Sequence, residues 1–311
     1  MPLNEMIAND GVDMSKYPEG VVNLYKIDGE CFGLPKDFDT IGLLYNKELF
    51  DAKGIAYPDD TWDWEKLVEV AAALTDPAEG VYGMAAEVSR QEVYYNFIYQ
   101  SGGTVLNDDN SRSGFDMPES VDAIQYMYDL IHKYKVSPTV QQLAETQPKT
   151  LFSSGKLAMM FLGSWNVSWM VNDEYVSKVG DITVLPSGKV RATMYNGLAN
   201  SASAFTEHKE AVWAWLKFLG SYDAQLIGSQ NGSAISAYEG TQEPWVDFRP
   251  EYNLGSFIEQ LPYAVQYPYI KESPQYLQFE KEIIIKILNN EIGIEEGCRS
   301  IAERVNYLLD S

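Results

Sequence analysis

Cysteine and histidine are scarce in this 311-residue sequence, which contains two of each. The two cysteines, Cys31 and Cys298, are too few for a disulfide framework, so two free thiols are expected. His132 and His208 stand apart on the predicted polar faces of two helices, and isolated histidines of this kind are seldom metal ligands. The sequence therefore predicts no metal site, and no motif in it indicates a cofactor.

Positive charge is also in short supply. The chain has 23 Lys and Arg against 45 Asp and Glu, which gives a formal net charge of -22. Such a surface repels nucleic-acid phosphates and anionic lipid headgroups, and it disfavours acidic ligands. We therefore expect no nucleic-acid partner.

Long apolar runs are missing from the chain. No window approaches 18 consecutive apolar residues, which excludes a transmembrane helix of ordinary length. The first ten residues have neither a basic start nor a long apolar stretch, so they are not a signal peptide. Two interpretations follow: the protein is cytoplasmic, or the front of the chain is absent.

The familiar catalytic motifs are absent as well. The sequence contains no zinc-protease His-Glu pattern, nucleophile elbow, phosphate-binding loop, Cys-x-x-Cys pair or dinucleotide-binding glycine pattern. We therefore expect a protein that is not an enzyme. The alternative is a glycoside-acting enzyme that uses two of the 45 carboxylates, and sequence spacing does not test it because such a pair is defined by a distance in space.

Short predicted strands alternate with helices along the chain. This order is typical of an α/β fold in which helices cover a largely parallel sheet. Residues 33–50 stand out, because Pro35 bends the chain, a buried strand is expected at 41–45, and a polar turn follows at 46–47. By itself this stretch fits a loop that leads into a core strand better than it fits a ligand site.

Aromatic residues recur beside the predicted strands. They lie just before a strand, after a strand, or at a second probable connection between domains: Phe38, Tyr94, Tyr95, Trp165 and Tyr195. In open α/β sheets, ligands bind beyond the carboxyl ends of the strands. Aromatic rings with polar neighbours match a sugar, which has apolar C–H faces and a rim of hydroxyls. For each ring taken alone, packing in the core is the more frequent role.

Two segments carry a family resemblance. They are Gly33-Leu34-Pro35 with Leu44-Tyr45-Asn46-Lys47-Glu48-Leu49-Phe50, and Gly155-Lys156-Leu157-Ala158-Met159-Met160 with Gly163-Ser164-Trp165. The sequence resembles the extracellular solute-binding proteins of sugar ABC transporters, the maltose-binding-protein family, and the similarity runs in order along nearly the whole chain. The resemblance implies a two-lobed periplasmic-binding-protein-like fold that binds a mono- or oligosaccharide between its lobes and delivers it to the membrane subunits of a transporter.

The resemblance also implies site residues. Trp165 matches the position of a tryptophan that stacks on the sugar in the family, and Asp39 the position of an acid that accepts sugar hydroxyls. The full set expected to bind the ligand is Trp165, Asp39, Phe38, Arg90, Glu92, Tyr94, Tyr95, Tyr195 and Asn196. Some family members carry a further stacking tryptophan near the C-terminal helices, where this chain has Tyr276, Leu277 and Phe279.

The expected lobes follow from the same comparison. Residues 1–36 and 190–235 form the N-terminal lobe, residues 37–189 and 236–311 form the C-terminal lobe, and hinge connections lie near 36–40, 186–195 and 233–237. The N-terminal lobe is expected to be incomplete, since the chain would lack the family's opening segment. We also expect a monomer that works outside the cytoplasm, in the periplasm or as a cell-surface lipoprotein. A truncated fragment that binds nothing is the remaining alternative.

Overall fold

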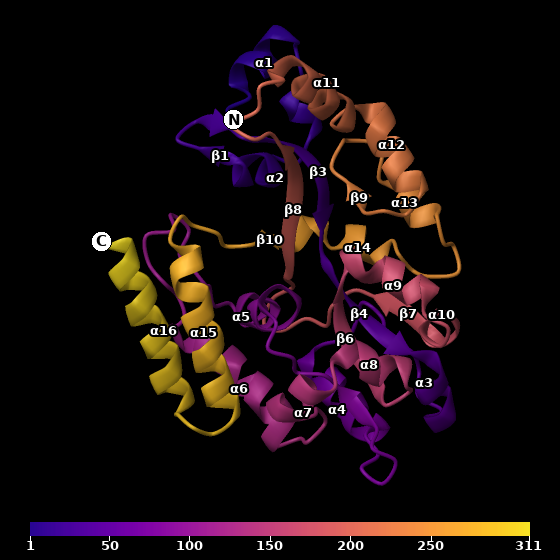
Figure 1. Ribbon diagram of the computed structural model, residues 1–311. Coiled ribbons are helices and arrows are strands. Elements are labelled where there is room, and N and C mark those ends of the chain that lie inside the picture. Colours follow the sequence, from indigo (N-terminus) through magenta and orange to yellow (C-terminus); the bar gives the residue numbers. More distant parts are fainter.

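The computed structural model describes residues 1–311 and has two lobes, each built around a four-stranded sheet (Figure 1). The upper lobe contains the N-terminus, and the lower lobe contains the C-terminus. In spatial order, the upper sheet consists of β10 (Ala264–Gln266), β8 (Thr193–Ser201), β3 (Gly33–Asp39) and β9 (Ile235–Ser236). The lower sheet consists of β5 (Tyr82–Met84), β6 (Leu157–Gly163), β4 (Ile41–Asn46) and β7 (Gly180–Thr183).

The lower sheet is built on two strands that are buried along their whole length. Every residue of β4 and of β6 is buried, in agreement with the strands predicted from their continuous apolar runs. The prediction of a largely parallel sheet was wrong. β4 pairs antiparallel with both β6 and β7, and β3 pairs antiparallel with both β8 and β9, so the parallel pairs are β5 with β6 and β10 with β8. Alternation of helices and strands does not determine the direction in which a strand enters its sheet.

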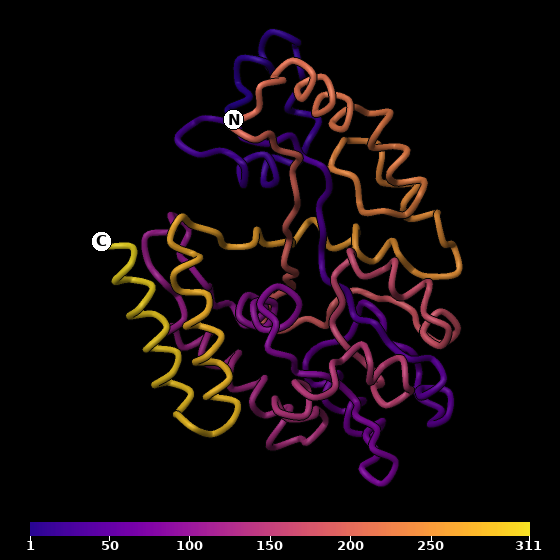
Figure 2. The backbone as a smooth tube through the Cα atoms, in the orientation of Figure 1, coloured from indigo at the N-terminus to yellow at the C-terminus, as the bar shows by residue number.

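One nearly continuous strand joins the two lobes. β3 ends at Asp39 in the upper sheet, and after Thr40 the chain continues as β4 in the lower sheet. The bend predicted at Pro35 is a shift of register within β3, between Pro35 and Asp37, and not a loop. β8 runs antiparallel beside β3, and Figure 2 shows the two segments side by side along the junction of the lobes. The hydroxyl of Thr193 accepts a hydrogen bond from the amide of Ile41 at 3.1 Å, which ties β8 to the start of β4.

Helices cover both sheets. Those of the upper lobe are α1 (Asn4–Asn9), α2 (Glu19–Leu24), α11 (Lys209–Leu219), α12 (Tyr222–Gln230) and α13 (Glu243–Asp247). Those of the lower lobe are α3 (Lys47–Lys53), α4 (Trp64–Leu74), α5 (Tyr95–Gln100), α6 (Pro118–His132), α7 (Val140–Glu145), α8 (Pro148–Ser153), α9 (Val167–Asn172), α10 (Val176–Val179), α14 (Ser256–Glu259), α15 (Ser273–Leu288) and α16 (Ile294–Leu309). Shorter elements are the hairpin β1 (Lys26–Ile27) and β2 (Glu30–Cys31), the 3₁₀ turns η1 (Met14–Lys16), η3 (Ser164–Asn166) and η4 (Leu261–Tyr263), and the π-helix η2 (Arg90–Tyr94).

The larger core belongs to the lower lobe. A cluster of 40 buried residues extends from β4 and β6 through α4, α5 and α6 to the C-terminal pair α15 and α16. Cys298 lies in this cluster and Cys31 is buried in the upper lobe, and both are free thiols. The cluster under α11 has only five buried residues, and Trp215 and Phe218 on the outer side of that helix are exposed. None of the helices is both long and apolar enough to cross a membrane.

Candidate ligand-binding site

The π-helix η2 lies at the centre of the candidate site. It begins after Ser89 and covers Arg90 to Tyr94, directly before α5. A π-helix carries an extra residue in its turn, and such turns occur often at functional sites. In η2 three consecutive side chains reach three different parts of the molecule. Arg90 reaches α15, Gln91 reaches the strands that join the lobes, and Glu92 reaches the end of β6.

Gln91 connects η2 to both joining strands. Its side-chain amide donates a hydrogen bond to the carboxylate of Asp39 in β3. Its carbonyl oxygen accepts one from the side chain of Asn196 in β8 at 3.3 Å. Asp39 and Asn196 are direct partners in the strand register, so one glutamine of the lower lobe holds both.

Glu92 supports the loop that carries Trp165. Its carboxylate accepts a hydrogen bond from the backbone amide of Gly163 at 3.2 Å and from the side chain of Asn166 at 2.9 Å. Lys149 also donates to Asn166. The ring of Trp165 lies against Gly163, where any added side-chain atom would meet it, and the tryptophan is 42% exposed. An accessible aromatic ring therefore stands beside a fixed carboxylate.

The pKa of the Asp39 carboxyl group is higher than usual. Burial raises its pKa from an ordinary 3.8 to about 7, and the negative charges of Asp37 and Glu92 act in the same direction. Hydrogen bonds from the backbone of Asn196 and the side chain of Gln91 oppose the rise. Asp39 can therefore change its charge near neutral pH, and its ionised form accepts hydrogen bonds strongly.

Arg90, Tyr94 and Tyr95 all contact α15. Tyr94 and Tyr95 are fully buried, and both hydroxyls donate to the carboxylate of Glu280 in α15. The guanidinium of Arg90 pairs with the same carboxylate at 2.9 Å and also donates to the carbonyl of Leu277. The expectation that Tyr94 or Tyr95 stacks on a ligand is corrected, because both rings are fully buried inside the lower lobe. The donors of Arg90 that these contacts use point towards α15.

Phe38 and Tyr195 lie on the opposite face of the joining strands from Asp39 and Asn196. Neighbouring residues of a strand point to opposite faces. The rings of Phe38 and Tyr195 pack against each other with centroids 5.8 Å apart, and both residues are buried. Of the nine predicted residues, η2 therefore connects Asp39 and Asn196, through Gln91, with the loop that carries Trp165, through Glu92, and the two rings lie on the other face of the joining strands.

Sequence reasoning missed Gln91 and Asn166. Gln91 is the residue that joins Asp39 to Asn196, and Asn166 links Glu92 to Lys149. Both are polar residues next to predicted site residues, which is a weak signal. Their partners are distant in sequence, so nothing local indicated the contacts.

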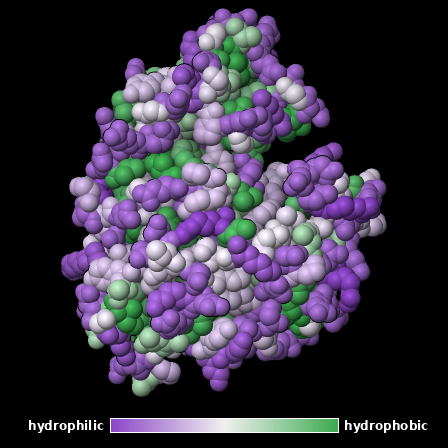
Figure 3. All heavy atoms as spheres, turned by 180° about the vertical axis from the view of Figure 1, so that it is seen from behind, coloured by the Kyte–Doolittle hydropathy of each residue, from purple (hydrophilic) through white to green (hydrophobic).

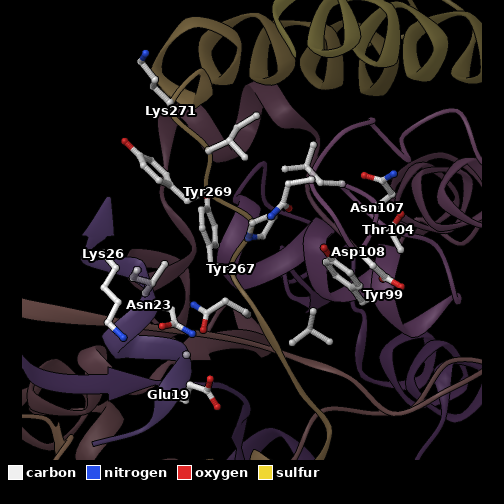
Figure 4. A pocket seen from close by; sticks show the side chains of 18 of the residues that line it. Glu19, Asn23, Lys26, Tyr99, Thr104, Asn107, Asp108, Tyr267, Tyr269 and Lys271 are labelled. Carbon is white, nitrogen blue, oxygen red and sulfur yellow. The ribbon is translucent and has the colours of Figure 1, made fainter. Parts of the chain in front are cut away.

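A separate cavity of about 1000 Å³ lies between the lobes (Figure 4). One wall comes from α2 and β1, a second from α5 and the loop after it, and a third from the segment between β10 and α15. Labelled lining residues are Glu19, Asn23, Lys26, Tyr99, Thr104, Asn107, Asp108, Tyr267, Tyr269 and Lys271. None of the predicted ligand-binding residues lines this cavity. The surface seen from behind is indented between the upper and lower parts (Figure 3).

No group of three or more His, Cys, Asp or Glu side chains is arranged to hold a metal ion. The candidate site contains one accessible indole ring, the carboxylate of Glu92 on the adjoining loop, and the linked carboxylate and carboxamide groups of Asp39, Gln91 and Asn196. Such a set can stack on an apolar face and accept or donate hydrogen bonds at its rim.

Comparisons with known proteins agree with this picture. A family model described as bacterial extracellular solute-binding protein matches residues 1–226. An ABC substrate-binding protein of Listeria monocytogenes, solved in complex with cycloalternan, superposes with a TM-score of 0.92 at 25% sequence identity, over 100% of this chain and 80% of that one.

Two curated relatives are similar in sequence. A putative binding protein of Brucella abortus is 25% identical over 242 residues, which are 76% of this chain and 58% of the relative. An arabinooligosaccharide-binding protein of Halalkalibacterium halodurans is 25% identical over 228 residues, which are 68% of this chain and 48% of the relative. The matched region thus spans about half the length of these relatives.

Proposed function

The chain belongs to the bacterial extracellular solute-binding proteins, and we propose that it binds a carbohydrate between its two lobes and delivers it to the membrane subunits of an ABC transporter. The observation that carries the proposal is the position of Trp165. Its ring is accessible, and Glu92, which fixes the loop beside it, belongs to the same π-helix whose Gln91 holds Asp39.

The residues divide the recognition of a sugar between them. Trp165 stacks on the apolar face of a pyranose or furanose ring. The carboxylates of Asp39 and Glu92 accept hydrogen bonds from its hydroxyls, and the carboxamides of Gln91 and Asn196 add a donor and an acceptor. Because the charged groups here are mainly acidic, the ligand is a neutral saccharide and not a uronate or a sugar phosphate.

We propose that binding closes the lobes by hinge bending. The hinges are the connections near 36–40 and 186–195 together with a third one after Ser236. The segment predicted for that third hinge, 233–237, contains β9, which pairs with β3 in the upper sheet. A ligand that touches both lobes favours the closed state, because only there are all its contacts made. The membrane subunits then recognise that state.

We propose binding without turnover, by a monomer that works outside the cytoplasm. In support, the family to which the chain belongs consists of extracellular binding proteins. A panel of chromogenic glycosides would reveal hydrolysis if two of the carboxylates acted as an acid and a nucleophile.

Isothermal titration calorimetry tests the proposal. The 311-residue chain is titrated with cycloalternan, maltotriose, arabinotriose, lactose and D-tagatose, in wild-type form and as Trp165→Ala. We expect at least one saccharide to bind and the substitution to cost about 2 kcal/mol, roughly 30-fold in Kd, as for a central aromatic contact. Trp215→Ala is the matched control, because Trp215 is exposed on α11 of the upper lobe. Absence of binding to every saccharide, or equal losses in the two variants, contradicts the proposal.

A further inference from the structure

Glu280 is a carboxylate inside the protein with an unusually complete set of donors. It is 0% exposed in α15. One of its oxygens lies 2.9 Å from Nε of Arg90 and 2.6 Å from the hydroxyl of Tyr94. The hydroxyl of Tyr95 lies 3.1 Å from both of its oxygens. All three donors belong to η2 or to the first residue of α5.

Burying Glu280 and Arg90 as an ion pair costs desolvation free energy, and the pair lies next to the candidate binding site. Burying a charged pair removes both ions from water, and a well-packed apolar substitute is often as stable or more stable. Burial raises the pKa of Glu280, and the charge of Arg90 and the hydroxyls of Tyr94 and Tyr95 oppose that rise. The lower lobe already has a cluster of 40 buried residues, so stability alone does not account for an ion pair at this place.

The hydrogen bonds to Glu280 come from both ends of the π-helical turn η2 and from the start of α5. Tyr94 is the last residue of the π-helix and Tyr95 the first of α5, so the change from one helix type to the other occurs at the residues that Glu280 holds. Their rings are perpendicular, with centroids 5.1 Å apart, and both hydroxyls converge on one carboxylate. Arg90 fixes the other end of the same turn.

Gln91 and Glu92 lie between those fixed ends. Gln91 holds Asp39 and Asn196, and Glu92 holds the amide of Gly163 beside Trp165. A rotation of the turn would therefore move each of these contacts at once. Loss of the negative charge at Glu280 removes the counterion of Arg90 and leaves both tyrosine hydroxyls with a weaker, neutral acceptor.

We propose that Glu280 is a positioning residue for the binding site: from α15 it holds η2 in the conformation in which Gln91 and Glu92 align Asp39, Asn196 and Trp165. Its effect on sugar affinity rests on the function proposed above. Its effect on the geometry of η2 does not rest on that function, because the contacts of Gln91 and Glu92 are present without a ligand.

The test compares Glu280→Gln with Glu282→Gln. Glu282 is exposed on the same helix, and its carboxylate accepts a hydrogen bond from Gln278, so it controls for the same substitution in α15. Hydrogen exchange of the Gly163 amide reports whether Glu92 still accepts its hydrogen bond, and titration with cycloalternan and maltotriose reports the affinity. We expect Glu280→Gln to speed the exchange at Gly163 and to weaken sugar binding about tenfold, as outer-shell residues do when they orient ligand-contacting groups. We expect Glu282→Gln to change neither.

A double-mutant cycle separates positioning from general destabilisation. If Glu280 acts through η2, Gln91→Ala and Glu280→Gln remove the same contacts, so their combined loss of affinity is smaller than the product of the single losses. Independent, multiplicative losses overturn the inference, as does a folded Glu280→Gln protein with wild-type affinity and unchanged exchange at Gly163.

Two milder variants keep the test decisive if Glu280→Gln does not fold. Tyr94→Phe and Tyr95→Phe each remove one donor to Glu280 and keep the ring, and they must produce smaller changes of the same sign at Gly163. If wild-type protein binds none of the saccharides, the proposed function fails, whereas the exchange measurement still decides whether Glu280 positions the turn.

Discussion

Asp39 and Asn196 lie opposite each other in β3 and β8, and the side chain of Gln91 hydrogen bonds to both. The donor end of Gln91 meets the carboxylate, and its acceptor end meets the carboxamide. A glutamine of the lower lobe thereby fixes two side chains of the strands that connect the lobes.

Gln91→Ala should separate ligand affinity from stability. The substitution removes two partly buried hydrogen bonds, each worth about 0.5–1.5 kcal/mol, so the free energy of unfolding should fall by roughly 1–3 kcal/mol. Sugar affinity should fall as well, because Asp39 and Asn196 lose the group that orients them. Urea unfolding and calorimetry measure the two effects, and Gln278→Ala on the exposed side of α15 is the control. Unchanged affinity in a folded Gln91→Ala protein would argue against a role for Asp39 and Asn196 in binding.

Asp39 should make stability depend on pH in an unusual direction. Its pKa is raised from 3.8 to about 7 in the folded protein, so the folded state holds a proton that the unfolded chain releases in this range. Relative to Asp39→Asn, the free energy of unfolding should therefore fall as pH rises from about 4 to about 7 and stay level above that. Urea titrations of both proteins at pH 4, 5.5, 7 and 8.5 measure the difference. A difference that is constant over this series would show that the pKa of Asp39 is not raised.

The same group should make sugar affinity rise with pH. A protonated Asp39 accepts hydrogen bonds from sugar hydroxyls less well than the ionised form. Because its pKa is about 7, affinity should increase between pH 6 and pH 8, and Asp39→Asn should abolish that increase. Calorimetric titrations in buffers of different ionisation enthalpy would also detect the proton released on binding.

Two tyrosine-to-phenylalanine substitutions should differ in their effect on stability. Tyr94 is fully buried and its hydroxyl donates to Glu280, so Tyr94→Phe should destabilise the fold by about 1–3 kcal/mol. The buried hydroxyl of Tyr195 has no hydrogen-bond partner among the protein atoms, so Tyr195→Phe should be neutral or slightly stabilising. Denaturant midpoints of the two variants provide the comparison. Equal destabilisation would mean that Tyr195 gains a partner in solution.

Gly163→Ala should displace Trp165. A methyl group at this position would overlap the six-membered part of the indole, and the exposed ring can move aside into solvent. We expect a change in tryptophan emission and a loss of sugar affinity close to that of Trp165→Ala, with a stability change below about 1 kcal/mol. Gly228→Ala is the control, because its added methyl has no neighbour nearer than 3.9 Å. Normal affinity in Gly163→Ala would show that Trp165 can stack from another rotamer.

The sequence predicted the parts of the site that local pattern determines. Continuous apolar runs located β4 and β6, and they indicated that Trp165 follows a buried strand, where it is indeed exposed. The directions of the strands in both sheets could not be predicted this way, because direction depends on how the chain returns from distant elements.

The prediction for Tyr94 and Tyr95 was wrong for a related reason. Tyr94 and Tyr95 follow a strand as a ligand-binding aromatic would, but they are buried because Glu280, 185 or 186 residues further along the chain, accepts their hydroxyls. Gln91 was missed for the same reason, since Asp39 lies 52 residues before it and Asn196 lies 105 residues after it. Partners separated by such distances leave no periodicity in the sequence.

The separation between Arg90 and Glu280 also sets when the site can form during synthesis. The ribosome must add 190 residues after Arg90 before its counterion exists. At about 5–20 residues per second this takes roughly 10–40 seconds. Until then Arg90, Tyr94 and Tyr95 lack the carboxylate that they share in the folded protein. The contacts of Glu280 with η2 and α5 therefore form only after most of the chain has been made.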